Sequence, residues 1–172
     1  MSAIVRPLGP HTPILAESAF VADTAAVLGE VELGEDSSVW YGCVLRGDVG
    51  LLKVGRRTNI QDLTVCHATT DHSSMVLGDE VTVGHRVILH GCTVHDRVLV
   101  GMGSIVLDLA VLESDVVLGA GSLVPPKARL ESGWLYLGNP ARKVRRLTDT
   151  DRAMIETGWR SYVELARRHR GA

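Results

Sequence analysis

An aliphatic residue recurs every six positions along most of this chain, and this period limits the possible fold more than any other feature. It runs unbroken from Val21 to Leu45 and again from Val94 to Leu130, with shorter runs between them. Small or β-branched residues recur four positions later in the unit, and glycine often follows the aliphatic residue directly. A period of six does not match the 3.6-residue turn of an α-helix, and hairpins would show strict alternation with longer polar turns.

Six residues suit one short strand and a corner, and three such units suit one triangular coil. The aliphatic residue would point inward, and glycine would permit the bend. The sequence therefore predicts an all-β solenoid, a parallel β-helix of hexapeptide repeats with roughly six coils. We expect residues 1–140 to form this β-helix domain, which carries the site inferred below.

Residues 141–172 are expected to form a C-terminal segment whose α-helix packs on the β-helix. Thr148 or Asp149 can cap this helix. Its apolar stripe, which we expect to be core packing, consists of Ile155, Trp159, Tyr162, Val163 and Ala166.

The composition agrees with a narrow aliphatic core. Of the 172 residues 45% are hydrophobic, but only 4% are aromatic, so Val, Leu, Ile and Ala must fill the interior. Cys43 and Cys66 take repeat positions inside the prism and are expected in the core, not as ligands. Trp40 and Tyr41 lie outside the inward register, and we expect them to face outward near the site inferred below.

Charge and cysteine usage indicate the class of protein. With 18 Lys+Arg against 20 Asp+Glu, the net charge is −2, which gives no reason to expect nucleic acid as a partner. No run approaches about 18 uninterrupted apolar residues, and the opening MSAIVRPLGPHTP lacks signal-peptide features. Three cysteines without a CxxC pair favour a reducing compartment. We therefore expect a cytoplasmic protein that binds no membrane.

Three breaks interrupt the period. There are three extra residues between Leu45 and Val54 and five between Cys66 and Leu77, whereas one residue is missing between Leu89 and Val94. Insertions in a solenoid map to loops on its outer surface, where function is often placed.

Five of the seven histidines fall around these breaks, namely His67, His72, His85, His90 and His95. Once the breaks are counted, Cys66 and Leu89 are one full coil apart. His67 and His90 each follow one of these inward residues, so they stack on one face, one strand spacing apart. Arg46 takes the same position in the coil before.

His85 lies on the preceding face, two places after an inward valine. Asp62 is one coil below it, with Gln61 beside Asp62. Three prisms side by side about a threefold axis would bring His67 and His90 of one subunit against His85 of the next. Three neutral imidazoles with an open fourth position form a catalytic zinc site. The register therefore predicts a homotrimer with a metal ion at each subunit interface.

Several segments resemble the γ-class carbonic anhydrase family of hexapeptide-repeat proteins, and its short bacterial members in particular: VWYGCVLRGD, TNIQD, CHA, VTVGHRVILHGCTV, VLVGMGSIVLDLA and GNPARKVR. The resemblance extends from about Pro10 to Tyr162. It implies a left-handed β-helix, a C-terminal helix, and a homotrimer whose interface metal is bound by His67, His90 and the partner subunit's His85. It also implies reversible hydration of carbon dioxide to bicarbonate by a metal-bound hydroxide, the chemistry for which carbonic anhydrase is the standard example. Zn²⁺ is the expected cofactor, with Fe²⁺ or Co²⁺ as alternatives.

The same resemblance implies roles for four further residues. Gln61 matches the family glutamine that orients the hydroxide or bicarbonate, and Asn59 matches a polar position that can hold Gln61. Arg46 and Asp48 match a pair that ties subunits together and borders the site, although a structural salt bridge is an equal alternative.

Two acidic positions of the family are not matched. Thr70 stands three residues after His67, where the family has a glutamate that shuttles protons, and Val49 stands where a second acidic residue is expected. Without a shuttle, the proton must pass directly to water or buffer. Asp71 and His72 in the inserted segment are possible substitutes, or simply solvated loop residues.

Three other functions share some of these features. The same metal site could hydrolyse a coenzyme A thioester, or a trimer could keep the metal only as a non-catalytic scaffold. A hexapeptide acyltransferase shares the fold but needs no third histidine, and 172 residues leave no acceptor-binding domain. The sequence separates the metal enzymes from the acyltransferase, but it does not separate an enzyme from a scaffold.

Overall fold

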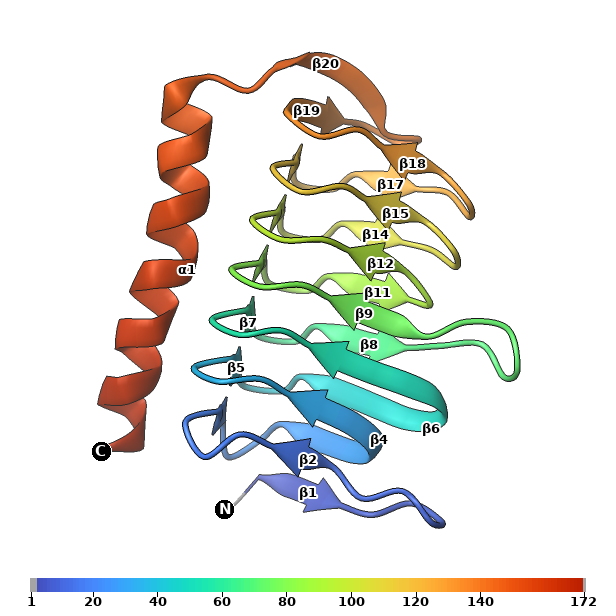
Figure 1. Ribbon diagram of the computed structural model, residues 1–172, viewed down its shortest axis with the longest axis vertical. Coiled ribbons are helices and arrows are strands. Elements are labelled where there is room, and N and C mark those ends of the chain that lie inside the picture. The colour runs from blue at the N-terminus through green and yellow to red at the C-terminus, as the bar shows by residue number, and fades with distance from the viewer. Residues whose placement is uncertain (1–2, 172) are drawn as a thin grey trace.

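A computed structural model, which describes residues 3–171, is a left-handed parallel β-helix followed by one helix (Figure 1). Residues 1 and 2 of the predicted segment 1–140, and residue 172 of the predicted segment 141–172, lie outside the described residues. The division of the chain at residue 140 stays a prediction. The predicted fold class is confirmed.

Each turn of the solenoid contributes a strand to each of three faces. The first face contains β1 (Ile4–Arg6), the first parts of β4 (Ala26–Leu33) and β6 (Val44–Val54), β8 (Val65–His67), β11 (Ile88–His90), β14 (Ile105–Val106) and β17 (Leu123–Val124). The second face contains β2 (Ile14–Leu15), the second parts of β4 and β6, β9 (Met75–Leu77), β12 (Thr93–Val94), β15 (Val111–Leu112) and β18 (Arg129–Leu130). The third face contains β3 (Phe20–Val21), β5 (Ser38–Val39), β7 (Asn59–Ile60), β10 (Thr82–Val83), β13 (Leu99–Val100), β16 (Val117–Leu118), β19 (Trp134–Leu137) and β20 (Arg142–Arg146), and helix α1 (Asp149–Arg170) follows it.

The solenoid makes about seven turns, one more than the repeat count predicted. The aliphatic series from Val21 to Leu130 leaves out β1, β2 and β19, which complete a turn's worth of strands at the two ends. Strands pair in parallel from turn to turn, except that β20 pairs antiparallel with β19. The count was low because end strands need not keep the aliphatic period.

Residues predicted to point inward form one continuous core. Leu45, Ile60 and Leu89 are fully buried, and neighbouring turns place such residues directly beside one another. Cys43 and Cys66 are buried within this core, as predicted. Burial raises the pKa of the Cys43 thiol to about 11, which keeps it protonated and unreactive.

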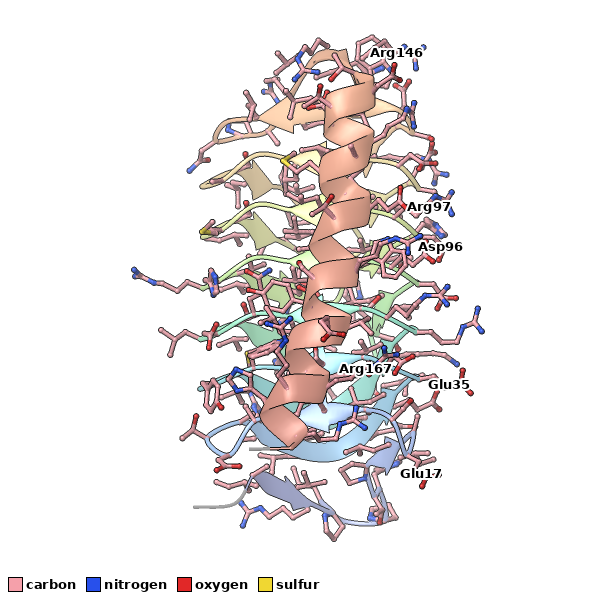
Figure 2. The ribbon with its side chains drawn as sticks, turned by 90° about the vertical axis from the view of Figure 1, so that its left-hand side faces the viewer. Glu17, Glu35, Asp96, Arg97, Arg146 and Arg167 are labelled. Carbon is pink, nitrogen blue, oxygen red and sulfur yellow. The ribbon has the colours of Figure 1, made fainter. Side chains whose placement is uncertain are left out.

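Helix α1 lies lengthwise over the third face and runs back toward the first turns (Figures 1 and 2). Ile155 packs with Leu147 near its start, and Ala166 packs with Phe20 and Trp40 near its end. The predicted apolar stripe therefore covers one face of the prism. Within residues 3–171, the helix lacks the long apolar stretch that crossing a bilayer would require.

The prediction that Trp40 faces outward near the site is wrong. Its ring points away from the prism axis, but α1 covers it, so that Trp40 is only 5% exposed. The ring centroid lies 5.1 Å from that of Tyr162 and 5.2 Å from that of Phe20. Tyr41 does reach the surface, at 38% exposure. The repeat predicts the direction of Trp40 but contains no information on the path of the helix.

A capping box holds the start of α1. The Asp151 backbone N–H donates to Thr148 Oγ1 at 3.3 Å, and the Thr148 backbone N–H donates to Asp151 Oδ2 at 2.7 Å. Arg145 Nη2 also donates to Asp151 Oδ1, at 3.1 Å. Hydrogen bonds from Arg145 and Thr148 hold the pKa of the Asp151 carboxyl well below its usual range.

We predict that Asp151→Asn lowers the free energy of unfolding by about 1–2 kcal/mol at pH 7, because it removes a charged acceptor at the helix start. The pKa of Asp151 is lowered in the folded state, so its contribution is complete above about pH 4 and is lost as the pH falls further. Urea denaturation should therefore show a smaller difference between wild type and variant at pH 3. Thr150→Ala, inside the first turn, is the control, and an equal effect of both substitutions would contradict the prediction.

Candidate metal centre

His67 and His90 lie side by side on the first face. They end β8 and β11 and are register partners in neighbouring turns, as the repeat predicted. Their ring centroids are 5.2 Å apart, and His67 Nδ1 lies 3.2 Å from His90 Nε2. Two ring nitrogens therefore face each other across a short gap.

A carboxylate engages the other nitrogen of each ring. His67 Nε2 lies 2.9 Å from Asp48 Oδ1, and His90 Nδ1 lies 2.8 Å from Asp108 Oδ2. An ionised carboxylate only accepts, so each neutral ring carries its proton on the nitrogen that faces the carboxylate. The two facing nitrogens then both present lone pairs, which repel unless a cation lies between them.

The gap between these nitrogens fits a shared metal ion. With metal–nitrogen bonds of about 2.0–2.1 Å and tetrahedral angles, two ligating nitrogens lie about 3.3 Å apart. The observed 3.2 Å between His67 Nδ1 and His90 Nε2 is close to this value. The donor set therefore suits Zn²⁺ or another metal that prefers imidazole.

The predicted pair of Arg46 and Asp48 is present within one chain. Arg46 Nη1 donates to Asp48 Oδ2, so that Asp48 bridges Arg46 and His67. Burial raises the pKa of the Asp48 carboxyl, but hydrogen bonds from His67 and Arg46 outweigh it and hold this pKa below its usual value. Asp48 is consequently ionised at neutral pH and is a firm acceptor for the His67 proton. A role of this pair between subunits stays a prediction.

His85 lies at the corner between the third and first faces. Its Nδ1 is 2.9 Å from Asp62 Oδ2, and its side chain is 40% exposed, so Nε2 is the nitrogen that Asp62 does not engage. Four residues, 86–89, separate it in the chain from His90 at the end of β11. Among residues 3–171, no three His, Cys, Asp or Glu side chains lie close enough to hold a metal ion. A single chain brings two of the three predicted ligands together.

Gln61 and Asn59 lie on the third face, on the same side as His85. They are 6% and 1% exposed. Gln61 Nε2 donates to Asn59 Oδ1 at 3.1 Å, and Asn59 Nδ2 donates to Thr82 Oγ1 at 3.0 Å. The predicted contact between Asn59 and Gln61 is therefore present, and it limits the orientations of the Gln61 amide.

The inserted segment 68–74 leaves the prism at the corner beyond His67 and projects outward between β8 and β9 (Figure 1). Asp71 and His72, the possible proton carriers, are exposed on it. Ser73 Oγ donates to Asp108 Oδ1 at 2.7 Å, and Thr69 Oγ1 does so at 3.0 Å. The same carboxylate thus contacts the loop and His90.

Asp108 was not predicted as a site residue. The register does contain a signal for it: Val106 lies one turn after Leu89, so Asp108, two residues later, comes beside Gly91, which follows His90. The hydrogen bond from the Leu109 backbone N–H to the Gly91 carbonyl, at 2.8 Å, agrees with this placement. Burial raises the pKa of the Asp108 carboxyl, but hydrogen bonds from Ser73, His90 and Thr69 hold it below its usual value. Asp108 is therefore ionised at neutral pH.

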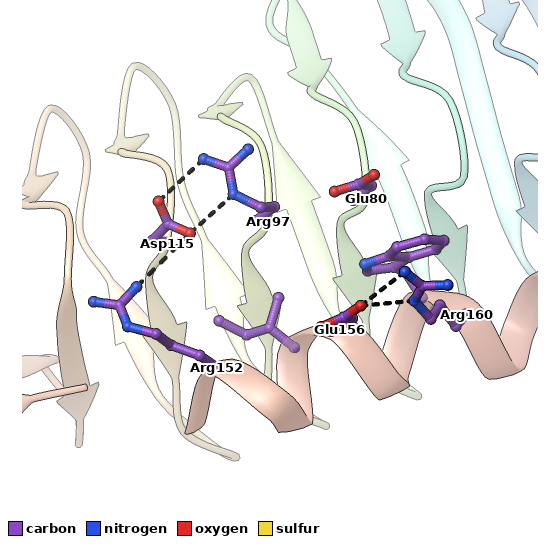
Figure 3. Close-up of a pocket in the computed structure, with 8 residues that line it drawn as sticks. Glu80, Arg97, Asp115, Arg152, Glu156 and Arg160 are labelled. Carbon is purple, nitrogen blue, oxygen red and sulfur yellow. Dashed lines mark hydrogen bonds and ion pairs between the residues drawn. The ribbon is translucent and has the colours of Figure 1, made fainter. Parts of the chain in front are cut away.

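A separate groove of about 340 Å³ lies between α1 and the third face (Figure 3). Its charged side chains are paired. Arg97 donates two hydrogen bonds to Asp115, and Arg160 Nη2 lies 2.8 Å from Glu156 Oε1. None of the predicted site residues lines it. These charged groups of the groove therefore pair with one another where the helix lies on the prism.

Comparison with known proteins first defines the class as a hexapeptide-repeat β-helix. A putative acetyltransferase of Bacillus cereus has the same fold, with a TM-score of 0.97, 39% identity and 99% coverage of both chains. No family model matches the chain.

Curated relatives then define the family. The Escherichia coli protein YrdA is 45% identical over 170 residues, which cover 95% of this chain and 92% of that protein. Carbonic anhydrase of Geobacillus kaustophilus is 42% identical over 161 residues, which cover 94% of this chain and 88% of that protein. Gamma carbonic anhydrase 2, mitochondrial, of Arabidopsis thaliana is 47% identical over 163 residues, and the match spans 59% of the plant protein's length. The chain belongs to the γ-carbonic anhydrase family, which confirms the resemblance in its sequence.

We predict that Asn59 and Gln61 are energetically coupled through their direct hydrogen bond. Asn59→Ala and Gln61→Ala should each lower the free energy of unfolding by about 1–3 kcal/mol, because each leaves a buried polar group without its partner. In the double variant the losses should fall short of their sum by about 0.5–1.5 kcal/mol. Urea denaturation of all four proteins measures this, and strictly additive losses would show that the two amides do not interact.

Proposed function

We propose that this protein is a homotrimeric, metal-dependent enzyme that hydrates carbon dioxide to bicarbonate and a proton, with one metal ion at each subunit interface. The observation that supports this most directly is the pair of facing nitrogens, His67 Nδ1 and His90 Nε2, 3.2 Å apart. Asp48 and Asp108 hold the protons on the opposite nitrogens. Membership of the γ-carbonic anhydrase family supplies the substrate of the proposal.

The position of the third histidine supports the proposed trimer. Asp62 does not engage Nε2 of His85, and His85 precedes β11, whereas His90 ends that strand. A head-to-tail interface that closes after three copies would bring each His85 to the neighbouring pair. The surface between His85 and the pair of His67 and His90 is apolar, since Val65 is 41% and Ile88 is 40% exposed. An exposed apolar strip of this kind is typical of a surface that another chain covers.

Zn²⁺ is the metal that three neutral imidazoles with an open position suit best, and Fe²⁺ or Co²⁺ are alternatives. When bound, the metal would lower the pKa of a coordinated water, as it does in carbonic anhydrases generally. Three free, buried cysteines support the cytoplasm as the location.

The remaining predicted residues position the reactants. Asn59 holds the Gln61 amide through Nε2, so that Gln61 Oε1 remains as an acceptor on the His85 side of the interface. Arg46 keeps Asp48 ionised, and Asp48 keeps the His67 proton away from the nitrogen that faces His90. These contacts hold the ligands in their neutral, correctly oriented form.

The proton released by hydration must leave the site. Thr70 has no titratable group, so the family's route is closed at that position. Asp71 and His72 are exposed on the same loop and can pass the proton to solvent. Buffer therefore competes with these side chains for the proton, and we propose that turnover depends on buffer concentration.

We predict that His90→Ala abolishes metal binding and lowers the rate of carbon dioxide hydration by more than about 100-fold, because it removes one of three ligands. Metal content of the purified protein and stopped-flow hydration measure the two effects. His95→Ala, which removes an exposed histidine five residues later, should leave both unchanged. Wild-type protein without bound metal would refute the site.

Metal without hydration activity would move the assignment to one of the alternatives. Hydrolysis of acyl-coenzyme A by the metal-loaded protein would favour the thioesterase. Acetyl transfer from acetyl-coenzyme A that survives removal of the metal would favour a hexapeptide acyltransferase. Loss of metal that dissociates the trimer, with neither activity present, would favour the scaffold.

Mixing two inactive variants tests whether the metal site is shared. His85→Ala and His90→Ala each lack one ligand, but an interface with His67 and His90 from the first and His85 from the second is complete. After subunit exchange of an equal mixture, about a quarter of the interfaces should regain metal and activity. Two separately purified variants, mixed without exchange, are the control. No recovery after proven exchange would mean that the three histidines do not meet between chains.

A further inference from the structure

Asp108 connects three parts of the chain that are far apart in sequence. Its Oδ2 lies 2.8 Å from His90 Nδ1, while its Oδ1 accepts from Ser73 Oγ at 2.7 Å and from Thr69 Oγ1 at 3.0 Å. The carboxylate is largely enclosed, with 22% of its side chain exposed. It lies outside the set of residues that the family resemblance assigns to the site.

The neighbouring glycine makes room for this cluster. Gly91 has a φ of +56°, and a Cβ there would lie 2.1 Å from Ser73 Oγ and 2.2 Å from Asp108 Oδ1. Any side chain at this position would therefore displace the hydrogen bond between Ser73 and Asp108. Gly91 also turns the shortened corner at which the repeat lacks one residue. The short corner and the long loop before it thus fit together around Asp108.

The proton position on His90 depends on this carboxylate. With the proton on Nδ1, His90 donates to Asp108 and presents the lone pair of Nε2 to His67. With the proton on Nε2, His90 would instead donate to His67 Nδ1, 3.2 Å away, and neither ring could bind a metal in the gap. An ionised acceptor at Nδ1 favours the first tautomer and makes the ligand more basic.

We propose that Asp108 is a positioning residue: it keeps the proton of His90 on Nδ1, aims Nε2 at the metal, and fastens loop 68–74 to this ligand through Ser73 and Thr69. The inference rests on the proposed metal site. It goes beyond that site because loop 68–74 then helps, through Asp108, to hold His90 in position.

The first test measures the tautomer of His90 in the metal-free protein by ¹⁵N NMR of the imidazole. We expect the proton on Nδ1 in wild type and a shift of the population toward Nε2 in Asp108→Ala. Asp108→Asn retains an acceptor of the same shape and should give an intermediate result. Asp115→Ala removes a carboxylate that pairs with Arg97 at another corner, and it should leave His90 unchanged. An unchanged tautomer in Asp108→Ala would overturn the proposal.

The second test measures Zn²⁺ affinity by competition with a chelator, and the coordination of Co²⁺ by its absorption spectrum. Asp108→Ala should bind Zn²⁺ about 10–100-fold more weakly, with a smaller loss for Asp108→Asn. Ser73→Ala, which removes one of the two hydrogen bonds from the loop to Asp108, should release the metal faster but leave the tautomer as in wild type. Wild-type affinity in both Asp108 variants would overturn the proposal even if the protein hydrates carbon dioxide.

The two proposals fail in distinguishable ways. If wild type binds neither Zn²⁺ nor Co²⁺, the proposed function fails, while the tautomer measurement still decides whether Asp108 positions His90. If Asp108→Ala does not fold, Asp108→Asn and Ser73→Ala still separate the role of the charge from that of the loop.

Discussion

The register of parallel strands from one turn to the next determines nearly everything else in this molecule. One aliphatic side chain per strand fills the interior, and neighbouring turns stack these residues directly on one another, as Leu45 does on Cys66. Adjacent strands lie about 4.8 Å apart, so outward side chains of equivalent positions form columns with the same spacing. Two imidazoles in such a column are close enough to bind the same metal ion without any loop to bring them together. His67 and His90 occupy such a pair of positions.

The irregular places of the repeat gather at one corner of the prism. The insertions after Leu45 and Cys66 and the deletion after Leu89 all fall between the first and second faces. Each follows a strand that carries Arg46, His67 or His90 just before the corner. The regular turns provide the fixed spacing of the site, and the irregular corner provides the contacts that a uniform repeat cannot make, such as the one from Ser73 to Asp108.

The sequence was sufficient for whatever depends on register alone. Counting inward residues placed His90 beside His67 and His85 above Asp62, and both pairs are in contact. It was not sufficient for features that depend on chain paths outside the repeat. The path of α1 buries Trp40, and the path of loop 68–74 brings Ser73 to Asp108 across an intervening turn. Neither path has a period that a sequence can reveal, although the glycine at position 91 was an available signal.

Dividing the ligands between chains would link metal binding to assembly. His67 and His90 each have a carboxylate on their own chain, and so does His85, through Asp62. Each of the three predicted ligands is therefore held by a carboxylate within the single chain, and in the proposed trimer little ordering would remain to oppose metal binding. In the proposed trimer, the free energy of metal binding adds to that of the apolar contact through Val65 and Ile88. A metal held in this way would stabilise the assembly that forms its own site.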